Sequence, residues 1–125
     1  MATLNISDLS VGDWVEYRDR EWQVCSLYQF TGEVGLWRKD SQICENVADC
    51  EPIPLTPEIL EKNGIHRTYE DDKYTIFRDD GLWAVKYSDG DWELSTPPVC
   101  RVDIKYVHQL QHVLRIAGID KEINL

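Results

Sequence analysis

Long apolar stretches are missing from this sequence of 125 residues. No window comes near the run of about 18 apolar residues that a membrane-spanning helix needs. The segment before Trp14 also lacks the basic stretch and apolar run of a secretory signal. We therefore expect no membrane association and a cytoplasmic location.

Basic side chains are scarce. The chain has 13 Lys and Arg against 23 Asp and Glu, which gives a net charge of -10. Proteins grip a phosphate backbone with Lys and Arg that displace counterions, so direct binding to nucleic acid is not expected. The acidity has two interpretations: a solvated surface that keeps the chain soluble, or a surface that binds a partner with basic groups.

Sequence motifs of known catalytic and metal sites are absent as well. There is no G-x-S-x-G elbow, no P-loop and no G-x-G-x-x-G. The cysteines at positions 25, 44, 50 and 100 contain no C-x-x-C pair of a structural zinc site, and reduced thiols are expected in the cytosol. Cys25 lies in an apolar strand pattern and is interpreted as a small core residue. The sequence therefore predicts no catalytic residues, no metal and no cofactor.

The first half of the chain has the alternation of strands. Runs rich in β-branched and aromatic residues predict strands at 14–18, 21–29, 34–37 and 43–47. The run 21–29 carries apolar groups on both faces, which is typical of a central strand. By analogy of fold, this half is expected to form an SH3-like small barrel or a meander.

A short helix is predicted in the middle of the chain, over Pro57 to Asn63. Thr56 is a good N-cap, and proline is favoured at the first helical position. Gly64 is a natural residue to follow the helix end, because glycine readily adopts positive φ.

A three-stranded meander is predicted over residues 74–93, ended by Pro97-Pro98. Its turns are Asp79-Asp80-Gly81 and Ser88-Asp89-Gly90, and Asp-Gly between alternating runs is a strong hairpin signal. An amphipathic C-terminal helix follows, with Asp103 as the expected N-cap and Gly118 at the end. The fold class is therefore α+β, with residues 1–125 as a single domain.

Half of the charge imbalance falls in one segment. Residues 70–93 hold eight acidic and three basic side chains, a net charge of -5. Aspartate is common at hairpin tips for its turn chemistry alone, so one interpretation is purely structural. The other is a carboxylate-lined surface that imitates nucleic acid or binds a basic protein. Its candidate partner-binding residues are Glu70, Asp71, Asp72, Asp79, Asp80, Asp89 and Asp91.

Three further residues are candidates for partner binding. Trp37 precedes Arg38-Lys39 and is a candidate exposed interface ring, although a core position is the alternative. His108 and His112 lie four apart, so they share one face of the C-terminal helix, away from its apolar stripe. Such a pair can bind a transition metal, but no H-E-x-x-H surrounds it, and a partner contact is favoured.

Three blocks resemble small uncharacterised proteins of Bacteroidota and their phages and prophages. They are SDLSVGDWV (7–15), EPIPLTPEILEKNGI (51–65) and IKYVHQLQ (104–111). The resemblance implies an accessory protein of a mobile element, and small acidic phage proteins are often inhibitors of host immunity.

These observations predict a non-enzymatic acidic binding protein that blocks a host defence protein with a basic surface, in the cytoplasm of the host cell. One alternative is a sponge that holds a small nucleotide signal at the interface of a homo-oligomer, using Arg38, Lys39, Arg67 and Arg101. A second alternative is a metal-dependent enzyme that uses His108 and His112.

Overall fold

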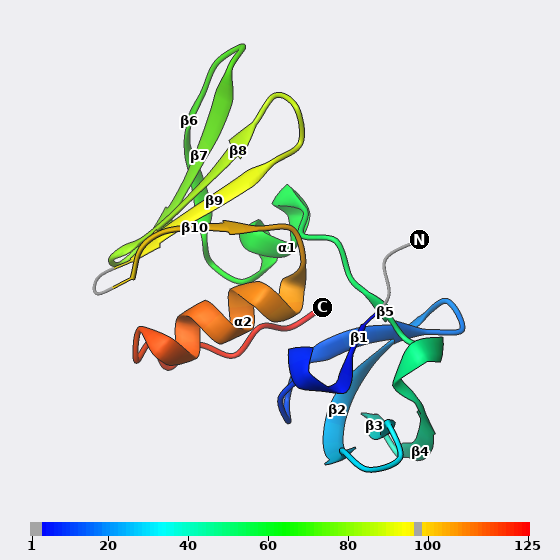
Figure 1. Cartoon of the computed structure of the whole chain (residues 1–125). Helices are drawn as coiled ribbons and strands as arrows, with labels where there is room; N and C mark the ends of the chain where they lie inside the picture. The colour runs from blue at the N-terminus through cyan, green and yellow to red at the C-terminus, as the bar shows by residue number, and fades with distance from the viewer. Residues whose placement is uncertain (1–3, 97–98) are drawn as a thin grey trace. The chain divides into compact units, whose positions relative to one another are not determined.

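The computed structural model describes residues 4–96 and 99–125, and the chain divides into two compact units. The first unit extends to Ile53 and the second begins at Pro54. Each contains one antiparallel five-stranded sheet (Figure 1). The predicted α+β class is confirmed, whereas the single domain stays a prediction.

Five strands and two 3-10 turns make up the first unit. In chain order they are η1 (Ile6–Asp8), β1 (Trp14–Tyr17), β2 (Arg20–Tyr28), β3 (Glu33–Arg38), β4 (Ser41–Asn46), η2 (Val47–Asp49) and β5 (Glu51–Pro52). The strand order is β4-β3-β2-β1-β5, so β2 is central, as predicted. After η2 the chain returns to pair β5 with β1 at the edge of the sheet.

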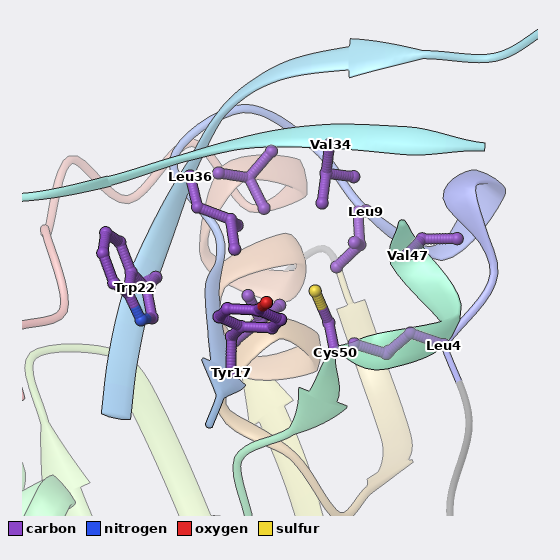
Figure 2. Close-up of a cluster of buried hydrophobic side chains, with 10 residues drawn as sticks. Leu4, Leu9, Tyr17, Trp22, Val34, Leu36, Val47 and Cys50 are labelled. Carbon is purple, nitrogen blue, oxygen red and sulfur yellow. The ribbon is translucent and has the colours of Figure 1, made fainter. Parts of the chain in front are cut away.

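The core of the first unit is a cluster of apolar side chains from its strands, from η2 and from the segments that flank the two 3-10 turns (Figure 2). Val34 and Leu36 are fully buried on β3, and Cys50 is 1 % exposed. Burial raises the pKa of the Cys50 thiol to about 11. Leu4 and Leu9 close this cluster from the segment before β1.

A β-bulge divides β2 into two halves. The register with β3 shifts between Val24 and Ser26, so Cys25 is the extra residue. Before the bulge Trp22 and Val24 point into the core, whereas after it Leu27 packs inward. Cys25 is only half-buried, so its prediction as a core residue is wrong.

The second unit contains the remaining strands and both α-helices. They are α1 (Pro57–Lys62), β6 (His66–Glu70), β7 (Tyr74–Asp79), β8 (Leu82–Tyr87), β9 (Trp92–Thr96), β10 (Val99–Ile104) and α2 (Val107–Ile116). The strand order is β10-β9-β8-β7-β6. The predicted meander is its centre, and β6 and β10 extend it on both sides. Pro97-Pro98, predicted to end the meander, lie outside the described residues.

The caps of α1 confirm the sequence interpretation. Thr56 Oγ1 accepts a hydrogen bond from the backbone N–H of Ile59 at 3.3 Å. Gly64 has φ +81° after the C-cap residue Asn63. This left-handed conformation suits glycine, so the helix ends where the sequence predicts.

The start of α2 differs from the prediction. Asp103 lies in β10, and the N-cap residue is Tyr106. Gln109 Oε1 accepts hydrogen bonds from the backbone N–H groups of Lys105 (2.7 Å) and Tyr106 (3.1 Å). Gln109, the third residue of α2, therefore provides a hydrogen-bond acceptor for the backbone N–H groups just before the helix. Within the described residues, no helix has the length and apolar character needed to cross a membrane.

The two faces of the second sheet differ in burial. Phe77, Ala84 and Leu94 lie in register on neighbouring strands and are fully buried. Their alternating neighbours Tyr74, Ile76 and the rest of the opposite face are half-buried or exposed. We call the face that carries Tyr74 and Ile76 the outer face.

Candidate binding surface

The turn between β6 and β7 is organised by one carboxylate. Asp71 Oδ1 accepts hydrogen bonds from the backbone N–H groups of Lys73 (2.8 Å) and Tyr74 (3.0 Å). Asp71 Oδ2 accepts a third from the Tyr69 hydroxyl at 2.8 Å. These donors, the backbone N–H of Tyr74 foremost, lower the pKa of Asp71 below its usual 3.8. The same carboxylate raises the pKa of the Tyr69 phenol.

The turn between β8 and β9 lies beside it. Asp89 Oδ1 accepts a hydrogen bond from the backbone N–H of Asp91 at 3.0 Å, and Gly90 has φ +95°. The backbone N–H of Ser88 donates to the carbonyl oxygen of Lys73 at 2.9 Å, which joins the two turns directly. A hollow of about 290 Å³ lies between them, and its lining includes Asp71, Asp72 and Asp89 together with Lys73 and Lys86.

Five of the predicted acidic residues are therefore gathered at one end of the second sheet (Figure 1). We call this end the paired tips, and define it by Glu70, Asp71, Asp72, Asp89 and Asp91.

The other two predicted acids do not belong to the paired tips. Asp79 is the last residue of β7 and Asp80 follows it, so both lie at the opposite end of this six-residue strand, about 20 Å away. Asp79 forms an ion pair with Lys121 at 3.2 Å. The structure therefore divides the predicted acidic set into two groups, one at each end of the sheet.

Most carboxylates of the paired tips form no ion pair among the described residues. Among the described residues, the ion pair at this end joins Glu70 to Arg67 at 3.3 Å. Asp71, Asp72, Asp89 and Asp91 take part in no ion pair there, and all four are exposed. Lys73 and Lys86 line the hollow beside these carboxylates without forming an ion pair to them, so the excess of negative charge at this end is open to a partner.

Tyrosine rings cross the outer face next to the paired tips. The Tyr69 and Tyr74 ring centroids are 5.6 Å apart, edge to face, and those of Tyr74 and Tyr87 are 6.4 Å apart. Tyr69 and Tyr87 are 47 % and 36 % exposed. The sequence interpretation missed this tyrosine row, although alternation within 74–79 and 82–87 places Tyr74 and Tyr87 opposite the buried residues.

Trp37 lies on β3 in the first unit, between Gln23 of β2 and Gln42 of β4. It is 46 % exposed, so the interpretation of an outward-facing ring fits its position. Two exposed aromatic residues of this unit were missed. Tyr28 ends β2 and Phe30 lies in the turn after it, and the bulge that turns Tyr28 outward has no clear signal in the sequence.

The two histidines of α2 do not form the exposed face expected for them. His108 is 5 % exposed and Gln111 is 7 % exposed. The His108 ring stacks on Tyr106, with centroids 5.9 Å apart, and meets His112 edge to face at 5.7 Å. Most apolar residues of α2 are buried, as their helical spacing predicts, but the polar residues His108 and Gln111 beside them are buried too.

Both alternative sites stay predictions, and the cations of the nucleotide alternative are divided between the two units. Among the described residues, no group of three or more His, Cys, Asp or Glu side chains could hold a metal ion. Of the cations named for a nucleotide, Arg67 pairs with Glu70 and Arg101 pairs with Glu93 at 3.4 Å.

Comparison with protein-family models, with curated proteins and with solved structures finds no match to this chain. The function is therefore argued from the surface itself.

Proposed function

We propose that this chain is a non-catalytic binding protein that holds a basic surface of a partner protein at its paired tips. The observation that carries the proposal is the direct link between the two turns, the 2.9 Å hydrogen bond from Ser88 to Lys73. It brings acidic residues that are almost twenty positions apart in sequence to one place.

The geometry of the tips favours binding over a purely structural role. Asp71 and Asp89 accept backbone hydrogen bonds, so turn chemistry accounts for them. Asp72 accepts no hydrogen bond among the described residues, and neither does the Asp91 carboxylate. Like charges held together raise the free energy of the unbound protein, and a cationic partner relieves that repulsion.

The resemblance to proteins of phages and prophages supplies a setting for this activity. In a mobile element, the partner would be a host protein, and occupying its basic surface would block that protein. We propose inhibition of a host defence component as the outcome.

The test is a capture of host proteins on three immobilised forms of the chain. The first is the wild type. The second carries Asp72→Asn, Asp89→Asn and Asp91→Asn at the paired tips. The third is a matched control with Asp40→Asn, Asp80→Asn and Asp120→Asn, exposed residues outside the tips.

Both triple variants change the net charge equally, and asparagine keeps the side-chain oxygen that the Asp89 turn needs. We expect the wild type and the control to retain the same protein at physiological salt, and the tip variant to lose it. Equal loss from both variants, or no specific protein at either low or physiological salt, would overturn the proposal.

A further inference from the structure

The tyrosine row is an aromatic surface whose outer rings, Tyr69 and Tyr87, are exposed, with the half-buried Tyr74 between them. Its residues lie on β6, β7 and β8, and on β7 and β8 they alternate with side chains of the buried face. Ile76 and Val85 pair between β7 and β8 on this same face and are only half-buried. A contiguous patch of this kind is characteristic of a contact surface.

Carboxylates border this patch on two sides. At one side Asp71 holds the Tyr69 hydroxyl. At the other side, Tyr87 opens into a hollow of about 430 Å³ over β9 and β10 that is lined by Asp91, Glu93 and Asp103. Lys105 is the one basic residue in its lining among the described residues. Glu93 is already paired with Arg101 at 3.4 Å, so Asp91 and Asp103 are the carboxylates of this hollow that a further cation would meet.

The outer face already holds cations of its own chain in this manner. The Arg78 guanidinium carbon lies 4.0 Å from the centroid of the Trp83 ring. Arg101 pairs with Glu93 at the rim of the hollow. Arg78 thus places a guanidinium above a ring, and Arg101 places one beside a carboxylate.

The spacing of the rings matches an extended chain. Alternate residues of a β-strand project on one side at intervals of about 6.6 Å. The centroid separations along the tyrosine row are 5.6 and 6.4 Å. Successive side chains on one side of an extended segment would thus meet successive rings.

We propose that the tyrosine row receives an extended segment of the basic partner, with Arg or Lys at alternate positions. The inference rests on the proposed function and adds to it the surface that contacts the partner's side chains. The carboxylates of the tips and of the hollow attract the segment, and the rings determine its spacing.

The test uses two synthetic peptides of equal composition and charge. One is Arg-Thr-Arg-Thr-Arg-Thr and the other is Arg-Arg-Arg-Thr-Thr-Thr, and Gln-Thr-Gln-Thr-Gln-Thr is the uncharged control. Binding to the full chain is measured by calorimetry at two salt concentrations. We expect the alternating arginine peptide to bind more tightly than the block peptide, and the glutamine peptide not to bind.

Three variants locate the contact. Tyr74→Leu and Tyr87→Leu keep an apolar side chain but remove the ring, and each should weaken the alternating peptide roughly three- to tenfold. Trp83→Leu is the matched control, because Trp83 is 41 % exposed on the same face and Arg78 already covers it. Its effect should be less than twofold.

The outcomes separate this inference from the proposed function. If the tip variant weakens peptide binding while both tyrosine variants bind like the wild type, the tyrosine row is not the contact and the paired tips remain the site. Equal binding of the alternating and block peptides, binding of the glutamine peptide, or no peptide binding to the wild type would each overturn the inference. The capture of host proteins would then decide the proposed function alone.

Discussion

Gly35 is required by the bulge in the first unit. It lies opposite Ser26 on β2, and a Cβ added to Gly35 would collide with Ser26 Oγ and lie 3.1 Å from Cys25 Sγ. We expect Gly35→Ala to lower the free energy of unfolding by about 1 to 3 kcal/mol, the usual cost of overpacking.

Chemical denaturation of four proteins checks this prediction. They are the wild type, Gly35→Ala, Ser26→Ala and the double variant. Because Ser26→Ala removes the colliding oxygen, the double variant should be more stable than the sum of the single changes implies. Strict additivity would contradict the proposed collision.

The Asp71 carboxylate gives the first tip a defined dependence on pH. The pKa of Asp71 is lower in the folded protein than in the unfolded chain. The stability that Asp71 contributes is therefore complete above its pKa in the unfolded chain and is lost as the pH falls through its pKa in the folded protein. The order of the turn should therefore persist at neutral pH and fail in acid. Exchange of the Tyr74 amide proton, followed against pH, measures this opening.

Asp71→Ala should open the same turn at neutral pH and return the pKa of Tyr69 toward its ordinary 10.0. Asp72→Ala is the control, since Asp72 makes no hydrogen bond to this turn among the described residues. An unchanged Tyr69 titration in Asp71→Ala, followed by NMR of labelled tyrosine rings, would refute the assignment.

Single positions were predictable where one local rule applies. Thr56 and Gly64 depend on helix capping alone, so their roles follow from the sequence. The partial exposure of Cys25 depends on a bulge, and the burial of His108 depends on what packs against a polar position of α2. These features arise from tertiary packing, which residue type and spacing do not encode.

At the scale of elements, the C-terminal tail is fastened to the end of α1. Asn63 Nδ2 donates to the carbonyl oxygens of Ile59 (2.8 Å) and Asn124 (2.9 Å). Its Oδ1 accepts from the backbone N–H of Asn124 at 2.8 Å, and Lys121 Nζ donates to the Asn63 carbonyl oxygen at 2.8 Å. Ile123, beside these hydrogen bonds in the sequence, is 3 % exposed.

Asn63→Ala should therefore lower the free energy of unfolding by about 1 to 3 kcal/mol, because it leaves buried polar groups of α1 and the tail without their hydrogen-bond partner. Hydrogen exchange should rise in residues 119–125. Lys62→Ala, one position earlier and exposed, is the matched control and should change neither quantity. Unaltered exchange of the tail in Asn63→Ala would show that this residue does not fasten it.

The elements that the sequence predicted are those with clean alternation or clear caps. The hairpin of β7 and β8 has both an alternating pattern and an Asp-Gly turn. In contrast, β6 is an edge strand with five exposed residues and a register shift between Arg67 and Tyr69. No buried face marks β6 as a strand, so its pairing with β7 could not be inferred.

At the scale of the molecule, the two compact units each possess a sheet and a core. Leu36 is fully buried in the first unit. Leu36→Ala should therefore lower the free energy of unfolding of this unit by about 2 to 5 kcal/mol. We expect hydrogen-exchange protection to fall in residues 4–53 and to persist in residues 54–125. A uniform loss of protection would instead establish the single cooperative domain that the sequence predicts.

The candidate site became visible only with the whole second sheet. The sequence showed that residues 70–93 are acidic, but not that two of their turns meet while the Asp79-Asp80 turn lies at the other end. That division follows from the up-and-down order of β6 to β9, and β6 was not predicted. The pairing of strands, rather than composition, therefore determines which acids can act together.

The most direct test of the paired tips as a binding site is hydrogen exchange of the full chain with and without the captured host partner. Binding should protect amides at 69–75 and 87–92 and leave the Asp79-Gly81 turn unchanged. Protection confined to the Asp79-Gly81 turn, or to α2, or to the first unit, would contradict the account.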